Sequence, residues 1–168
     1  MLKDPQNYPY ETIRTLISNL NESDKGIAAL AYGTGARASE LNQITQKCIT
    51  TTADHLRITC PVLKKRGGAQ VSRIAVIRLD EQWLVDPIRA LMAGKSADDR
   101  LVPYHRITIY KKLVAAMGIN PHGFRKLRAT HLAVKFKFTG QQLTHFFGWS
   151  RSDMADAYIK MNTEDIEY

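Results

Sequence analysis

Residues 47–79 read KCITTTADHLRITCPVLKKRGGAQVSRIAVIRL, and this stretch decides the fold class. Its segments 47–52, 56–62 and 71–79 are rich in isoleucine, valine and threonine, and polar and apolar residues roughly alternate along each of them. Such alternation is typical of half-buried strands. Asp54 and His55 separate the first two segments, and residues 65–68 (KRGG) separate the last two, in both cases with residues that favour turns. We therefore predict a small antiparallel sheet of three strands.

On both sides of this stretch the apolar residues recur with the period of an α-helix. Before it we expect helices over residues 10–20, 24–32 (capped by Ser23) and 36–41, and after it over 81–92, 107–117, 122–136, 140–147 and 152 to about 161. In the first of these helices Ile13, Leu16, Ile17 and Leu20 share one face. The chain of 168 residues has no repeat, low-complexity stretch or Pro/Gly-rich linker. We therefore predict one domain of the α+β class, mainly α-helical, with one small three-stranded antiparallel sheet.

The composition excludes several classes of protein. With 44% hydrophobic residues, the chain can bury a core without disulfides or metal. No apolar run approaches the ~18–20 residues that cross a bilayer, and the opening MLKDPQ lacks the pattern of a secretory signal. Cys48 and Cys60 stand in no metal-binding spacing, which suits a reducing compartment. We expect a cytoplasmic protein that makes no contact with a membrane.

The positive charge is concentrated in one part of the chain. The net charge is +8, and residues 100–152 contain ten lysines and arginines but no aspartate or glutamate. The ten are Arg100, Arg106, Lys111, Lys112, Arg125, Lys126, Arg128, Lys135, Lys137 and Arg151. Because so dense a block of like charge would repel itself, it predicts a polyanionic partner, namely nucleic acid. A basic solubilising face is the alternative.

Common catalytic motifs are absent from the sequence, which has no Walker A loop, GxGxxG, HExxH or GxSxG and five histidines without metal-ligand spacing. We expect neither a metal nor a cofactor. Residues 121–132 (PHGFRKLRATHL) are more informative. Pro121 favours the first turn of a helix, and His122 and Arg125 share one face near its N-terminus, where backbone amides and the helix dipole favour an anion. A solvated basic helix is the alternative.

Three segments together resemble the tyrosine recombinases, also called the phage integrase family. HGFRKLRATHL (122–132) resembles the family's HxLRHTFATHL box, and AALAYGTGARASEL (28–41) resembles its first arginine box, ATGLRxSEL. FFGWS (146–150), with Tyr158 nine residues after Trp149, resembles the LGHS segment and its nucleophilic tyrosine. The boxes follow the family's order and cover nearly the whole chain. The resemblance implies an integrase-type catalytic domain over residues 1–168, without the N-terminal core-binding domain of many members.

The resemblance carries over to individual residues. Arg37 matches the family's first arginine, His122 and Arg125 match its His-x-x-Arg pair, and Tyr158 matches its nucleophile. Two guanidiniums can bind the non-bridging oxygens of a phosphodiester and stabilise the charge that grows in the transition state. A phenol is mostly protonated at neutral pH, so Tyr158 needs cationic surroundings or a base such as His122.

Two further site residues match the family pattern less directly. Trp149 stands where most members have a second histidine; its indole N–H can donate to a phosphate oxygen but cannot exchange a proton. The family lysine falls between the second and third strands, where we choose Lys65 over Lys64 because Lys-x-Gly matches the common form of this turn. We read Glu40 as a residue that orients Arg37 or the local backbone.

The resemblance implies a site-specific DNA recombinase or integrase of a mobile element or chromosome. Tyr158 would cut one strand through a 3′-phosphotyrosyl bond without metal or ATP, and a 5′-hydroxyl would rejoin it. The implied partner is double-stranded DNA. We expect a homotetramer on paired DNA sites, or a monomer for this fragment alone. The implied location is the cytoplasm, either at the nucleoid or on virus or plasmid DNA in the host. Lys126 and Arg128 would contact the DNA backbone or solvent. The alternatives are a type IB topoisomerase, a catalytically silent DNA-binding relative, and a basic helical module for RNA or protein.

Overall fold

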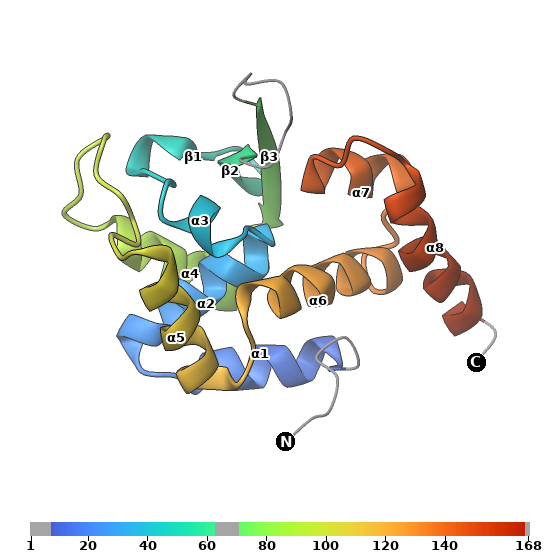
Figure 1. Ribbon diagram of the computed structural model, residues 1–168, viewed down its shortest axis with the longest axis horizontal. Helices are drawn as coiled ribbons and strands as arrows, with labels where there is room; N and C mark the ends of the chain where they lie inside the picture. Colours follow the sequence, from blue (N-terminus) through green and yellow to red (C-terminus); the bar gives the residue numbers. More distant parts are fainter. Residues whose placement is uncertain (1–7, 63–70, 167–168) are drawn as a thin grey trace.

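The structure of the protein, a computed structural model, describes residues 8–62 and 71–166, with the side chains of residues up to 160. Over these residues the chain is mainly helical with one three-stranded sheet, which confirms the predicted fold class (Figure 1). The helices are α1 (Tyr10–Ser18), α2 (Glu22–Thr34), α3 (Ala38–Leu41), α4 (Gln82–Met92), α5 (Arg106–Met117), α6 (Pro121–Val134), α7 (Gly140–Phe147) and α8 (Asp153–Ile166). A 3₁₀ turn, η2 (Gln46–Cys48), precedes the strands β1 (Ile49–Thr51), β2 (His55–Val62) and β3 (Val71–Arg78).

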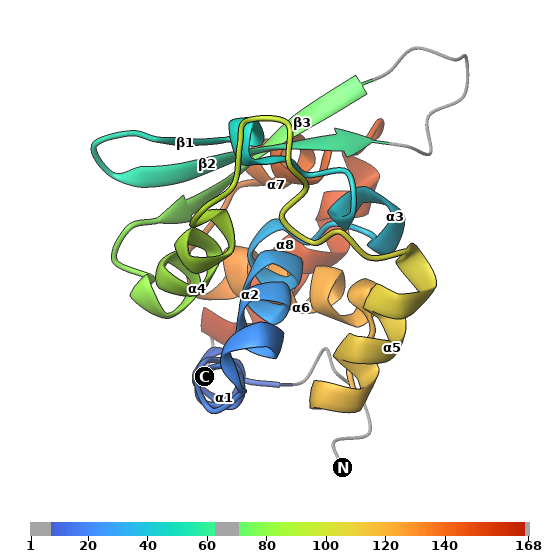
Figure 2. The same ribbon diagram turned by 90° about the vertical axis from the view of Figure 1, so that its left-hand side faces the viewer.

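The sheet is antiparallel, with the strands in the order β1-β2-β3. β2 and β3 pair along their whole length, from His55 opposite Arg78 to Val62 opposite Val71, and form the long ribbon in Figure 2. β1 is shorter than predicted because the first predicted residues form η2, in which the N–H of Cys48 donates to the carbonyl of Thr45 at 3.0 Å.

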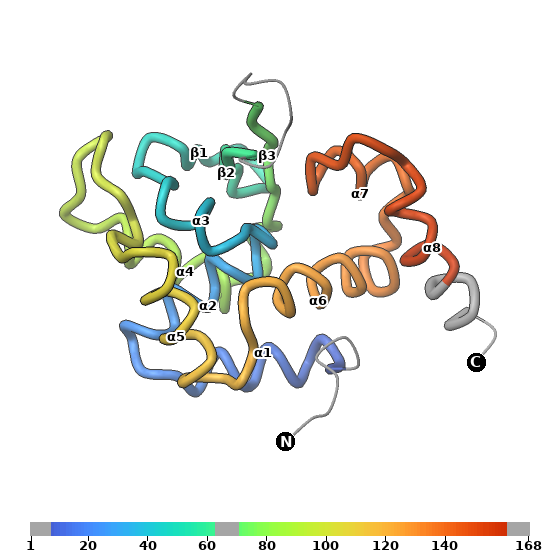
Figure 3. The backbone as a smooth tube through the Cα atoms, in the orientation of Figure 1, coloured from blue at the N-terminus to red at the C-terminus, as the bar shows by residue number. Residues whose placement is uncertain are grey.

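Helix α2 forms the centre of the molecule and lies between the sheet and α1 (Figures 1 and 3). Its residues 26–34 are all buried, as expected for a helix that other elements surround. Ile13 and Ile17 of α1 are buried, whereas Leu16, which we placed on the same face, is exposed because its position on the helix turns it outward. Neither α2 nor any other helix in the described part of the chain is long and apolar enough to cross a membrane.

Two predicted boundaries of α2 are wrong. Asn21 rather than Ser23 caps the helix, and its side chain accepts a hydrogen bond from a backbone N–H in the first turn at 2.9 Å. The helix also continues through Gly33 and stops only at Gly35, which has a φ of 63°. A left-handed residue ends a helix, and glycine adopts that conformation without steric cost.

A buried ion pair joins α6 to the start of α4. Arg128 donates two hydrogen bonds to the carboxylate of Glu81, each at 3.0 Å, and both side chains are buried. The hydroxyl of Tyr10 also donates to Glu81, at 2.8 Å. Burial would raise the pKa of Glu81, but Arg128 holds it below its ordinary value. The prediction that Arg128 contacts DNA or solvent is therefore wrong, because the side chain lies on the inner face of α6.

His131, one turn further along α6, is also structural. Its Nε2 lies 2.7 Å from the carbonyl of Tyr8, and its Nδ1 lies 2.6 Å from the hydroxyl of Tyr32. Burial lowers the pKa of His131 to about 4, so the ring is neutral at pH 7. A neutral ring donates from Nε2 to the carbonyl and accepts from the tyrosine at Nδ1, which satisfies all three buried groups.

The ion pair predicts a large loss of stability for Glu81→Gln. The free energy of unfolding should fall by about 3–5 kcal/mol, because the change leaves the Arg128 guanidinium buried without a counter-charge. Urea denaturation followed by circular dichroism measures this. The control is Glu22→Gln, which removes an exposed partner of Lys25 and should cost less than about 1 kcal/mol. Equal losses in the free energy of unfolding for the two variants would show that the buried ion pair is not an important source of stability.

Candidate active site

The C-terminal ends of α2 and α7 meet in the interior. Each helix ends in a glycine with positive φ, Gly35 at 63° and Gly148 at 66°. A Cβ on Gly35 would lie 2.6 Å from the Phe147 ring, so the turn requires glycine for its backbone conformation and for this close approach. The last carbonyls of an α-helix lack partners within the helix and form its negative end. Two such ends therefore need hydrogen-bond donors between them.

Arg125 of α6 supplies two of these donors. Its Nη1 donates to the carbonyl of Gly35 at 2.8 Å, and its Nη2 donates to the carbonyl of Phe147 at 3.2 Å. The guanidinium carbon also lies 5.0 Å from the centre of the Phe147 ring. Only 7% of Arg125 is exposed. Burial, with the nearby charges of Arg73 and Arg37, lowers the pKa of Arg125 to about 10, so its side chain still carries a positive charge at neutral pH.

Arg73 of β3 makes a parallel bridge that the sequence analysis missed. It donates to the carbonyl of Phe146 at 2.6 Å and to that of Thr34 at 2.7 Å, and only 4% of it is exposed. Burial lowers its pKa as well. The sequence did hold a signal, because the alternation of β3 places Arg73 on the same buried face as Ala75 and Ile77. We call Arg73 and Arg125, with the four carbonyls that they join, the arginine clamp.

Arg37 lies just beyond the clamp and is more accessible. It is the N-cap residue of α3, and its side chain is 31% exposed. Its backbone N–H donates to Glu40 Oε1 at 2.9 Å, and its Nη1 donates to Oε2 at 3.2 Å. Glu40 is buried, and it orients both the Arg37 side chain and the local backbone, as we expected. The remaining N–H groups of Arg37 can therefore be presented in a fixed direction to an anion.

Two aromatic rings, those of Phe147 and Trp149, connect the clamp to Tyr158. The rings of Phe147 and Trp149 stack at 4.9 Å with an angle of 19° between their planes. Trp149 and Tyr158 stack at 5.9 Å with an angle of 14°. Tyr158 is half-buried on α8, which lies against α6 and α7 (Figure 1). Burial raises the pKa of Tyr158 and the charge of Arg125 opposes that shift, so the phenol is protonated at neutral pH.

The structure brings together most of the residues predicted for the site. Those near the clamp are Arg37, Arg125, Trp149 and Tyr158. His122 lies three residues before Arg125 and is exposed in the first turn of α6, where Asn120 accepts a hydrogen bond from the Gly123 N–H at 2.8 Å. Lys65 and the alternative Lys64 fall outside the described residues. Among the residues that are described, no group of three or more histidine, cysteine, aspartate or glutamate side chains is placed to hold a metal ion.

A basic pocket opens beside Arg37, between α3 and α5. Its lining includes Arg37, Arg106 and Lys111, and the exposed side chains of Ile107 and Tyr110 form its apolar part. Arg106 and Lys111 both belong to the acid-free segment 100–152. Positive charge and aromatic surface next to Arg37 suit the backbone and bases of a nucleic acid.

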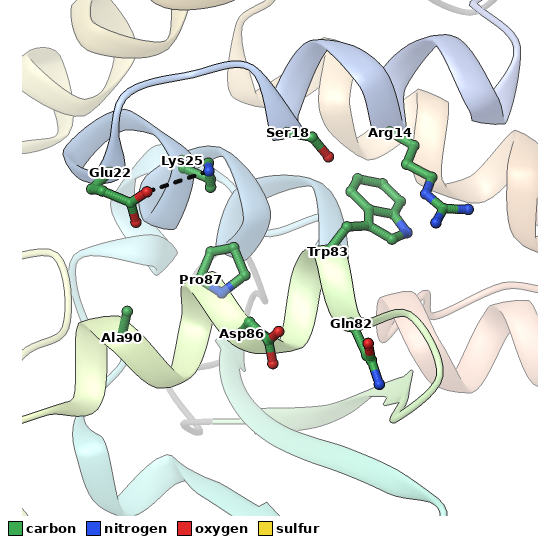
Figure 4. A pocket seen from close by; sticks show the side chains of 9 residues that line it. All are labelled: Arg14, Ser18, Glu22, Lys25, Gln82, Trp83, Asp86, Pro87 and Ala90. Atoms are coloured by element: carbon green, nitrogen blue, oxygen red, sulfur yellow. Dashed lines mark hydrogen bonds and ion pairs between the residues drawn. The ribbon is translucent and has the colours of Figure 1, made fainter.

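A second pocket, between α1, α2 and α4, has a different chemistry (Figure 4). Arg14 and Lys25 line it together with Glu22 and Asp86, and Trp83 forms part of its wall. Lys25 is already paired with Glu22 at 3.4 Å. Because its charges are mixed and it contains none of the predicted site residues, this pocket does not extend the basic surface.

Comparison with known proteins identifies the family and the fold. Residues 8–165 match the model of the phage integrase family. The chain is 28% identical to the tyrosine recombinase XerD of Chlamydia trachomatis, over 99% of this chain and 56% of that protein. Similar solved structures include the XerH site-specific recombinase bound to its difH substrate before cleavage (TM-score 0.66, 15% identity, 98% of this chain and 53% of that chain). Another is the XerA recombinase (TM-score 0.65, 18% identity, 90% of this chain and 59% of that chain).

The chain therefore spans about half the length of the relatives that it matches. The solved structures share its fold, and the family model covers nearly all of its residues. From its sequence boxes, its fold and this match, the chain belongs to the phage integrase family, the tyrosine recombinases.

Proposed function

We propose that the chain carries the catalytic domain of a site-specific DNA recombinase that cuts and rejoins DNA strands through Tyr158. The observation that carries this proposal is that Arg37 and the stacked Tyr158 both lie near Arg125, in a member of this family. A phosphodiester resists attack because its own charge repels nucleophiles. Guanidiniums on its non-bridging oxygens stabilise the charge that develops in the transition state.

The chemistry proposed for the site conserves the energy of the phosphodiester bond. The Tyr158 oxygen attacks phosphorus, the bond to the 5′ oxygen breaks, and a 3′-phosphotyrosyl bond takes its place. His122 accepts the phenolic proton, and Lys65 gives a proton to the departing 5′ oxygen. The 5′-hydroxyl of a partner strand then reverses these steps and releases Tyr158. Neither ATP nor an external nucleophile is consumed.

The proposed partner is double-stranded DNA, which would lie across the pocket between α3 and α5. Arg106 and Lys111 would contact phosphates there, while Arg37 reaches the scissile one. A similar solved structure supports this partner, since the XerH recombinase was solved bound to its difH substrate. We propose a homotetramer on two paired sites, acting in the cytoplasm on chromosomal, phage or plasmid DNA.

The nucleophile is tested by Tyr158→Phe. The variant should fold and bind duplex DNA like the parent but form no covalent adduct, because only the attacking hydroxyl is removed and the ring keeps its stacking. The measurement is a denaturing gel after incubation with nicked suicide duplexes that carry candidate attachment sequences. Tyr110→Phe, which removes the hydroxyl of an exposed tyrosine in the basic pocket, should still form the adduct. A denaturation-resistant adduct with Tyr158→Phe would identify another nucleophile.

The phosphate-binding role of Arg37 is tested by Arg37→Lys. Lysine can still face Glu40 but lacks the planar fork, so single-turnover cleavage should slow by about 10²–10³-fold, the usual effect of removing one preorganised donor. The control, Arg106→Ala, should weaken DNA binding and leave the cleavage rate at saturating DNA unchanged. Cleavage by Arg37→Lys at the parent rate would exclude a direct contact with the scissile phosphate.

Binding to duplex DNA should depend strongly on salt and weakly on sequence. A protein that neutralises Z phosphates has a log–log salt slope of roughly −0.9Z, and each lost phosphate contact reduces that slope by about 1. Fluorescence anisotropy across a salt series should therefore show smaller slopes for Arg106→Ala and Lys111→Ala, and the parent slope for Arg14→Ala in the mixed-charge pocket. DNA binding that does not depend on salt would show that phosphate contacts of the basic pocket do not carry the affinity.

A further inference from the structure

Three arginines are buried in the part of the chain that the structure describes, and Arg73 and Arg125 differ from Arg128 in how their charge is balanced. Arg128 is neutralised by Glu81. By contrast, none of the ion pairs between described residues includes Arg73 or Arg125, whose Nη groups donate to backbone carbonyls instead. The buried carboxylate of Glu40 raises the pKa of both arginines and so offsets part of their burial, but it forms no ion pair with either of these two described side chains. Because burying a guanidinium without a directly paired carboxylate is costly, the carbonyl contacts must supply the rest of the stabilisation.

The two arginines hold consecutive carbonyls at each helix end. Arg73 joins Thr34 to Phe146, and Arg125 joins the next residue of each helix end, Gly35 to Phe147. The two bridges are therefore in register, and each limits the same separation between α2 and α7. Without Arg73, two carbonyls at converging negative helix ends would lose their donors, and Arg125 alone would have to keep the ends together.

The residues that follow these carbonyls are the ones proposed to handle the phosphate. Arg37 comes two residues after Gly35, and Trp149 comes two residues after Phe147. Gly148, between Phe147 and Trp149, packs directly on the stem of Arg73, since a Cβ there would lie 3.2 Å from Arg73 Cδ. Arg73 therefore constrains the start of the segment that carries Trp149 by polar and apolar contacts.

We propose that Arg73 is a positioning residue for strand cleavage: by joining the carbonyls of Thr34 and Phe146 it sets the spacing between Arg37 and Trp149 and keeps Trp149 stacked on Tyr158. This inference rests on the proposed recombinase function. Arg73 acts through the two helix ends and does not itself contact DNA. Lysine should not replace it, because one ammonium group cannot offer two fixed, coplanar donors to two carbonyls.

The test compares Arg73→Lys and Arg73→Met with Arg57→Met, a control that changes an exposed arginine on the neighbouring strand β2. All three are made with Trp83→Phe, so that Trp149 is the only tryptophan of the chain. The first measurement is the emission and acrylamide quenching of Trp149 in the folded protein. The second is the single-turnover rate of adduct formation on a nicked suicide duplex, with duplex affinity measured in parallel.

Both Arg73 variants should shift the emission of Trp149 to the red, increase its quenching and slow adduct formation by about 10–10²-fold, the cost of a small misplacement of reacting groups. Their affinity for duplex DNA should stay within about twofold of that of the Trp83→Phe protein. Arg57→Met should match the Trp83→Phe protein in emission, quenching, cleavage rate and affinity. If Arg73→Met does not fold, Arg73→Lys, which keeps the charge and the stem, decides the question.

Two results would overturn the inference. Parent-like emission and cleavage in the Arg73 variants would show that the clamp does not position the site. Emission and adduct formation at the level of the Trp83→Phe protein in Arg73→Lys alone would show that a positive charge at this position is enough, without the two hydrogen bonds of the guanidinium. A parent protein that forms no adduct on any duplex would refute the recombinase function instead, and the emission of Trp149 would still decide whether Arg73 positions it.

Discussion

Four hydrogen bonds from two buried arginines to the carbonyl ends of two helices hold the candidate site together. An unsatisfied buried carbonyl costs about 1–3 kcal/mol, and an unpaired buried guanidinium costs more. Each group therefore requires the other, and the four bonds link β3 and α6 to α2 and α7. The turn that carries Arg37 and the segment that carries Trp149 occupy their places because of this link.

The sequence predicted the sheet and most of the residues that the structure brings together at the candidate site, because both depend on local patterns. The alternation in residues 47–79 is visible without knowing what covers the strands, and the family boxes contain Arg37, Arg125, Trp149 and Tyr158. Arg73 and Arg128 were missed or misplaced because their partners are distant in sequence. Arg128 finds its carboxylate 47 residues away, and Arg73 finds its two carbonyls 39 and 73 residues away.

The acid-free segment 100–152 also has two roles that its composition could not separate. Arg125 and Arg128, on successive turns of α6, face the interior, and Arg151 is paired with Asp153. Arg106 and Lys111 of α5 remain exposed beside the pocket that contains Arg37. The surface proposed for DNA is therefore smaller and more local than the charge count suggested, which agrees with a site that reads the backbone near one phosphate.

The position of Arg128 one turn after Arg125 has a mechanical consequence. A rotation of α6 that withdrew Arg125 from the carbonyls of α2 and α7 would also separate Arg128 from Glu81 and leave both charges buried. Because of that cost, α6 is held in one rotational position. The clamp holds α7 in the same way, because withdrawing α7 would leave the buried guanidiniums of Arg73 and Arg125 without the carbonyls of Phe146 and Phe147, so the ends of α2 and α7 are fixed relative to α6.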